Sequence, residues 1–102
     1  MTSYEQTQAA LDDWRKIAKY TRDNYGEAQT RKYMSSLLKC IETAAKGTGV
    51  YKDKKMGARK IRIKHCQKHY IFSLVQKNKP LLVLAIFHEK MDLMTRLKDR
   101  LH

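Results

Sequence analysis

The segment RKIRIKHCQKHYIFSLVQKNKPLLVLAIF, residues 59–87, decides the fold because it contains three consecutive strand patterns. In residues 59–64 isoleucines alternate with basic residues, so the isoleucines share one face of an extended chain and the bases share the other. Residues 69–76 are β-branched and aromatic, and residues 81–87 are a continuous apolar run, which is typical of a strand covered on both faces. The short links between these runs permit only antiparallel pairing.

The chain before this segment has the spacing of two helices. Apolar residues recur every three or four positions from about Gln8 to Tyr25, and they do so again in residues 27–45. Gly26 separates the two patterns, and glycine readily adopts the positive φ that ends a helix. Two helices joined by so short a link are expected to form a hairpin.

Three shorter segments complete the prediction. Residues 4–7 are a candidate first strand, residues 50–56 are expected to be a basic loop, and residues 91–101 have the spacing of a short C-terminal helix. Helices that precede strands indicate an α+β fold, in which the N-terminal helical hairpin packs on a small antiparallel β-sheet. A length of 102 residues predicts a single domain spanning residues 1–102.

Positive charge is the strongest feature of the composition, with a formal net charge of +12. Between Lys46 and Lys79 eleven Lys and Arg residues stand against one acid, Asp53, so most of the excess lies in the middle of the chain. A protein this basic attracts polyanions over the electrostatic screening length. Nucleic acid and an acidic protein segment are both candidates, although aromatic residues near these bases are too few for a typical single-strand binder. A solvated basic face is the simpler alternative.

The sequence also indicates where the protein works. The longest apolar run, residues 81–87, is too short to cross a membrane. The first six residues carry neither a basic head nor an apolar segment, so we expect no secretory signal and a cytoplasmic location. Cys40 and Cys66 lack the paired spacing of a zinc site. We expect them to be reduced, separately buried thiols, with a disulfide or a reactive thiol as the alternative.

These elements, in this order and with particular residues, resemble the RelE/ParE superfamily of bacterial type II toxins over nearly the whole chain. Ala10 to Tyr20 is similar to the family's opening helix, and Asn24-Tyr25-Gly26 is similar to its interhelix turn. Arg59-Lys60-Ile61-Arg62 and an aromatic strand carrying Tyr70 follow in the family's order. The sharpest match is Ile86-Phe87-His88-Glu89-Lys90-Met91-Asp92, which resembles the ParE branch.

The resemblance to the ParE branch implies a toxin that poisons DNA gyrase by binding it and that is held in check by an acidic antitoxin. The RelE branch would instead imply a ribosome-dependent endonuclease that cleaves mRNA. A non-enzymatic gyrase inhibitor is therefore our first hypothesis, an endoribonuclease is the alternative, and a DNA-binding module motivated by charge alone is a third. We expect no cofactor and no membrane association, and either a homodimer or a toxin–antitoxin hetero-oligomer is compatible with the sequence.

A nuclease needs a general base, a general acid and cations around one phosphate. The residues that would supply them are Arg62, Tyr70 and His88. For His88 we favour a hydrogen bond that orients the final helix. A metal site is not expected, because His65 and His69 stand four apart across a strand connection, where that spacing does not place two side chains on one face as it does in a helix.

Binding of the antitoxin or the target is expected from the bases of the predicted strand and loop, from one aromatic anchor and from the segment after the last strand. These residues are Trp14, Lys54, Lys55, Arg59, Lys60, Arg62, Lys64, His88, Met91 and Asp92. Most of the apolar helix positions, by contrast, are expected to form the core. We expect the strand's bases to lie on the outer side of the sheet, away from the hairpin.

Overall fold

The structure, a computed structural model, describes residues 3–101 and is mixed α+β, as the sequence predicts. Its elements in chain order are β1 (Tyr4–Gln6), α1 (Gln8–Lys46), β2 (Lys52–Met56), β3 (Arg59–Cys66), β4 (His69–Leu74), β5 (Leu81–His88) and α2 (Leu93–Arg100). Neither helix in this part of the chain combines the length and apolar character that a bilayer span requires.

All five strands form one sheet in the order β1-β5-β4-β3-β2. The three predicted strands correspond to β3, β4 and β5, and they pair antiparallel as expected. The candidate first strand is also present as β1, but it pairs parallel with β5. Parallel pairing needs a long connection between the two strands. Here α1, β2, β3 and β4 lie between the two strands in the chain.

The prediction of a basic loop over residues 50–56 was wrong for most of its length, because Lys52–Met56 is strand β2. This strand lies at the edge of the sheet, and its first four side chains are exposed. Its sequence therefore has no alternation of apolar and polar residues that would indicate a strand. Pairing with β3, rather than local sequence, makes this segment extended.

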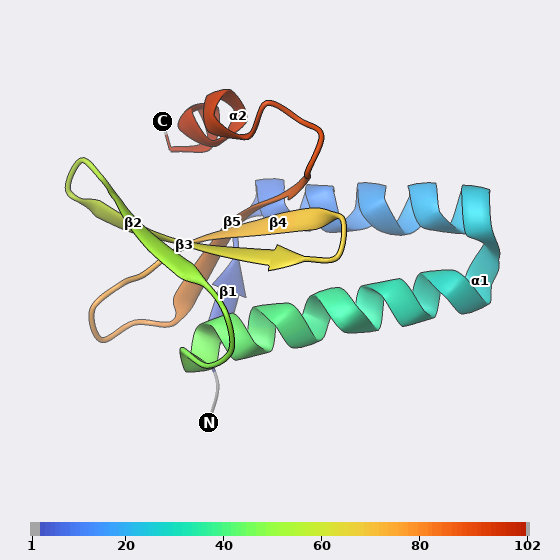
Figure 1. The fold of residues 1–102 in the computed structure, drawn as a ribbon, viewed down its shortest axis with the longest axis horizontal. Helices are drawn as coiled ribbons and strands as arrows, with labels where there is room; N and C mark the ends of the chain where they lie inside the picture. The colour runs from blue at the N-terminus through green and yellow to red at the C-terminus, as the bar shows by residue number, and fades with distance from the viewer. Residues whose placement is uncertain (1–2, 102) are drawn as a thin grey trace.

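Helix α1 folds back on itself at Gly26, where the backbone has φ 86° and ψ 174°, as the sequence predicts. Thr7 caps the start of the helix by accepting a hydrogen bond from a backbone N–H three residues later. Gly47, with φ 73°, ends it in the left-handed conformation common at helix ends. The result is a hairpin of two arms, residues 8–25 (the first arm) and residues 27–46 (the second arm) (Figure 1).

Helices cover both faces of the sheet: α1 packs on one face and α2 on the other (Figure 1). The first core cluster lies between α1 and the sheet and consists of Ala10, Leu37, Ile41, Cys66, Ile71, Val83 and Ile86. The second core cluster lies on the α2 side and consists of Ile61, Phe72, Leu84, Ala85, Phe87 and Leu97. Strand β5 contributes to both clusters, which confirms that it is covered on both faces.

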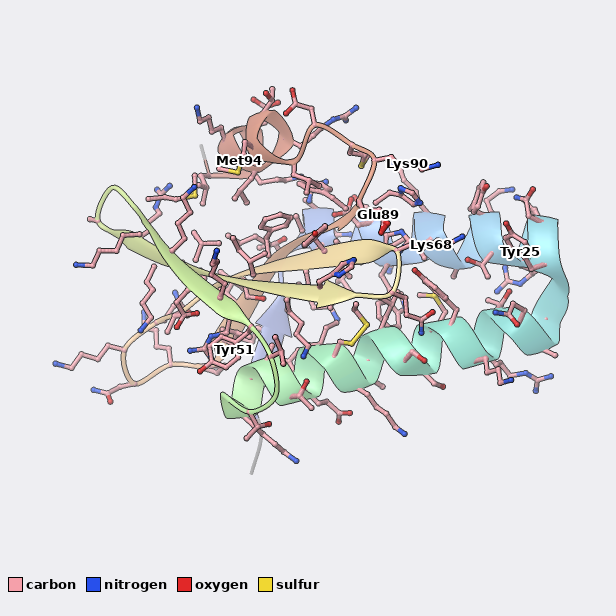
Figure 2. All side chains as sticks on the ribbon, viewed as in Figure 1. Tyr25, Tyr51, Lys68, Glu89, Lys90 and Met94 are labelled. Atoms are coloured by element: carbon pink, nitrogen blue, oxygen red, sulfur yellow. A yellow bond between two sulfur atoms is a disulfide. The ribbon has the colours of Figure 1, made fainter. Side chains whose placement is uncertain are left out.

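Cys40 and Cys66 form a disulfide that joins the second arm to the end of β3 (Figure 2). The expectation of two separate reduced thiols was therefore wrong. The second arm lies across β3 at this point and brings the two Cα atoms to 6.3 Å, within the range that a disulfide allows. The two cysteines are 26 residues apart in the chain, so this proximity follows from tertiary packing.

Candidate partner-binding site

The basic residues of β2 and β3 lie on both faces of the sheet. Lys60, Arg62 and Lys64 share one face, as predicted, but it is the face on which α1 packs. Lys54 and Arg59 lie on the opposite face, the α2 side. The expectation that the bases of this strand lie on the face opposite the hairpin was wrong. The isoleucines that alternate with them pack under α2 in and around the second core cluster, which leaves the bases on the α1 side.

Arg62 makes an internal network at the end of α1. Its Nη1 donates to the backbone oxygen of Ala44 at 2.8 Å, and its Nε and Nη2 donate to the Asp53 carboxylate at 2.9 and 3.1 Å. Its guanidinium lies 4.1 Å from the ring centroid of Tyr51, which is labelled in Figure 2. Hydrogen bonds from Arg62 hold the pKa of Asp53 below its usual range, and the same bonds raise the pKa of Arg62. Arg62 therefore joins β3, β2 and the helix terminus, where a cation is favourable.

The bases on either side of Arg62 also bond within the fold. Lys64 donates from Nζ to the backbone oxygen of Val50 at 2.8 Å. Lys60 places its Nζ 3.7 Å from a carboxylate oxygen of Asp53. The α1-facing bases of β3 thus bond to the end of α1, to the segment that follows it and to β2, and Asp53 offsets one of their three charges.

Arg59 lies at the rim of a hollow on the α2 side of the sheet. It donates to the backbone oxygen of Leu101 at 2.7 Å and so ties β3 to the end of α2. The hollow has a volume of about 490 Å³ and is lined by Met56, Gly57, Arg59, Lys98 and Leu101. Lys54 and Lys55, on the adjoining strand, are exposed and form no ion pair within residues 3–101. Lys54 lies on the same side of the sheet as the hollow, whereas Lys55 lies on the α1 side beside Lys60. An apolar floor with basic residues around it suits an amphipathic acidic segment.

The structure does not bring together the residues that a nuclease would need. Arg62 and His88 lie on the α1 side of the sheet, whereas Tyr70 lies on the α2 side and stacks on His65, with ring centroids 4.4 Å apart. Arg62 and His88 are also two strands and four positions apart, which is about 13 Å along the strand direction alone. These three side chains therefore cannot surround one phosphate in this arrangement.

His88 ends β5 and hydrogen-bonds the connection to α2. Its Nδ1 accepts from the backbone N–H of Lys90 at 3.1 Å. The cap of α2 is Asp92, whose carboxylate accepts from the backbone N–H of Thr95 at 3.4 Å and from its hydroxyl at 2.9 Å. Met91 lies between them and is 40% exposed. Of this predicted segment, Met91 therefore has an exposed apolar side chain, while His88 and Asp92 shape the turn.

His69 lies beside His88, with ring centroids 5.2 Å apart, and its Nδ1 is hydrogen-bonded to the hydroxyl of Tyr33 on the second arm. Burial, reinforced by the nearby His88, lowers the pKa of His69 to about 4, so its imidazole is neutral at pH 7. Burial also raises the pKa of Tyr33, so the phenol stays protonated at pH 7. His65 stacks on Tyr70 on the other face of the sheet, so His65 and His69 do not lie side by side.

A buried ion pair that the sequence analysis did not identify joins the first arm, α2 and β5. Asp13 and Arg100 form two hydrogen bonds of 2.8 and 2.9 Å. The N–H of Ile86 also donates to Asp13 at 3.0 Å, and Arg100 donates to the backbone oxygen of Leu84 at 2.9 Å. Strand β1 pairs with β5 only as far as Val83. The ion pair therefore satisfies backbone groups that no neighbouring strand reaches.

The exposed aromatic side chains of the hairpin lie nearer its turn than Trp14, the predicted anchor. Trp14, a predicted partner anchor, packs partly buried against the first core cluster. Tyr20 and Tyr25 are more open, at 62% and 63% exposed, and Figure 2 shows Tyr25 at the turn. Exposed tyrosines are common anchors in protein interfaces, which makes the turn a second candidate contact region.

Comparison with known proteins gives matches in sequence and in structure. The family model described as ParE toxin of type II toxin-antitoxin system, parDE, matches residues 4–93. Toxin ParE of Escherichia coli is 46% identical over 101 residues, which cover 99% of this chain and 98% of that protein. A solved chain from the chromosomal ParDE TA system of P. aeruginosa superposes with a TM-score of 0.69 at 14% identity, covering 86% of this chain and 96% of the solved one.

Proposed function

Since this chain belongs to the ParE toxin family and is the toxin component of a type II toxin–antitoxin system, we propose that it inhibits DNA gyrase by binding it and that an acidic antitoxin neutralises it in the cytoplasm. The observation that carries the proposal is the nearly full-length match to a ParE relative. The match extends through residues 86–92, the segment whose sequence most resembles the ParE branch. Gyrase poisoning is what that resemblance implies.

The arrangement of the candidate nuclease residues supports a binding mechanism over a cleaving one. Activation of a ribose hydroxyl needs an acid, a base and a cation within hydrogen-bond reach of one phosphate. Tyr70 lies on the opposite face from Arg62 and His88. The guanidinium of Arg62 already donates hydrogen bonds to Asp53 and to the end of α1.

Charge and shape support an acidic antitoxin. The net charge is +12, and the hollow lined by Met56 and Leu101 is bordered by the bases Lys54, Arg59 and Lys98. A helix or extended segment with apolar residues on one side and acids on the other would bury the apolar floor and pair with these bases. Replacing Lys54 and Lys98 by glutamate should weaken antitoxin binding and make the remaining affinity less sensitive to salt.

A supercoiling assay with purified gyrase tests the proposal. The purified chain is added to gyrase, ATP and relaxed plasmid, and the topoisomers are separated on an agarose gel. We expect dose-dependent loss of supercoiling, and full activity when the antitoxin encoded beside the toxin is mixed with it first. Complete supercoiling at a large molar excess of the chain would reject the gyrase target.

The nuclease alternative is tested in a translating extract. We expect the message to remain full-length with the wild-type chain. Shortened message that becomes intact again in the Tyr70→Phe and His88→Ala variants would favour a ribosome-dependent endonuclease and contradict the binding mechanism.

A further inference from the structure

The two arms of the α1 hairpin differ in how their basic residues are used. In the first arm three of the four bases are paired, and Lys16 is the exception among the described residues: Arg15 lies 3.5 Å from Asp12, and Lys19 lies 2.8 Å from Asp23. Arg22 is also paired, 2.6 Å from a glutamate just beyond the turn. Lys16 is therefore the one base of the first arm without an acidic partner in residues 3–101, whereas all four bases of the second arm lack one.

In the second arm the bases have no acidic partner. Arg31, Lys32, Lys39 and Lys46 are exposed and form no ion pair with any residue from 3 to 101. Lys32, Lys39 and Lys46 are seven residues apart, which is close to two helical turns, so they follow one side of the helix at steps of about 10.5 Å. Glu42 is the one acid on this side. We call these four bases the cationic ridge.

The surface beside the cationic ridge is hollowed at two places. A hollow of about 400 Å³ is lined by Ala28, Arg31, Lys32, Ser35, Ser36 and Lys39. A second hollow, of about 890 Å³, lies at the end of the helix and is lined by Ser3, Ala45, Lys46, Asn78, Lys79, Pro80 and Leu81. At this end of the cationic ridge, Lys46 therefore lines the same hollow as Lys79 of the turn between β4 and β5.

We propose that the cationic ridge binds the phosphate backbone of duplex DNA. Contacts to phosphates are made by Lys, Arg and small hydroxyl side chains, which are the residues that the ridge and its hollows offer. A protein partner would normally need an apolar or aromatic centre in the contact surface. The ridge has none beyond Leu38, which lies on its flank and is 37% exposed. The proposal deepens the proposed inhibition of gyrase, an enzyme that holds duplex DNA, but the observations behind it do not involve gyrase.

The test compares two variants with equal net charge. The ridge variant carries Lys32→Gln, Lys39→Gln and Lys46→Gln, and the matched control carries Arg15→Gln, Lys19→Gln and Arg22→Gln. Each loses three positive charges from exposed helix positions. Binding of the purified chains to a short fluorescent DNA duplex is measured by anisotropy over a series of salt concentrations.

We expect the ridge variant to bind more weakly at every salt concentration. The slope of log K against log salt should fall by roughly 2.7, about 0.9 for each lost phosphate contact. The control should keep a slope close to that of the wild type. Equal weakening of both variants would show that total charge alone attracts DNA and would overturn the proposal. If the ridge variant does not fold, Lys39→Gln alone should still lower the slope by about 0.9.

Two further outcomes separate this proposal from neighbouring ones. If the ridge variant keeps its DNA affinity but loses binding to the acidic antitoxin, the ridge is a protein interface and the proposal is wrong. Because gyrase is absent from the anisotropy assay, a chain that fails to inhibit gyrase can still bind DNA through the ridge. Failure of the proposed function and failure of this inference are therefore distinguishable.

Discussion

The ion pair between Asp13 and Arg100 offers the sharpest test of how the fold is held together. Replacing Asp13 by alanine removes both hydrogen bonds to Arg100 and the acceptor for the N–H of Ile86. The variant would leave a charge and a backbone donor in a site where the Asp13 side chain is 11% exposed and the Arg100 side chain 25%. Helix α2 would lose its main polar link to the first arm.

The expected loss of stability follows from the burial. Removing one partner of a buried ion pair costs about 3–5 kcal/mol, and the partial exposure of Arg100 favours the lower end of that range. We therefore expect Asp13→Ala to lower the free energy of unfolding by about 3 kcal/mol. Asp13→Asn keeps an acceptor for Ile86 and should cost less, about 1–2 kcal/mol.

Urea unfolding followed by circular dichroism measures this difference. The matched control is Asp12→Ala, because Asp12 is the adjacent carboxylate, is 53% exposed and lies 3.5 Å from Arg15. The control should lie within about 0.5 kcal/mol of the wild type. If Asp13→Ala and Asp12→Ala differ by less than about 1 kcal/mol, the ion pair does not hold α2 in place and our reasoning about the β5 edge is wrong.

Three further predictions concern other contacts in the fold. Reduction of the disulfide, or Cys40→Ser, should lower the free energy of unfolding by about 3.5 kcal/mol, the value expected for a closed loop of 26 residues. Equal urea midpoints with and without reductant would contradict this. The pKa of His69 is about 4 in the folded chain and 6.5 ordinarily, so stability should fall as the pH drops from 6.5 toward about 4, and His69→Gln should flatten the pH profile of unfolding over that range. Arg62→Met should lower the free energy of unfolding by about 2–3 kcal/mol, because Asp53 and the end of α1 lose their partner. The folded variant should bind the antitoxin almost as tightly as the wild type, and a large loss of affinity would show that Arg62 belongs to the binding surface.

Local periodicity predicted most of the fold. The turn at Gly26 and the strands β3, β4 and β5 all follow from spacing and composition that a short window contains. Strand β2 could not be found in this way, because an exposed edge strand has no apolar face to impose alternation. The parallel pairing of β1 with β5 likewise depends on a contact between distant segments.

The candidate site was less predictable, because periodicity shows which residues share a face but not what covers that face. Lys60, Arg62 and Lys64 share a face as predicted. The opposite face, which carries the isoleucines, is the one on which α2 packs. The ion pair between Asp13 and Arg100 is a contact 87 residues apart, so no local pattern indicated it. Hydrogen bonds between residues so far apart in the chain can be identified only when the fold is known.

The topology of a reporter plasmid in living cells tests the central claim most directly. Expression of the chain without its antitoxin is induced, and plasmid is isolated before growth stops. Our account predicts that relaxed topoisomers accumulate and that co-expressed antitoxin restores normal supercoiling. Plasmid that stays normally supercoiled in cells that the chain has already arrested would contradict it.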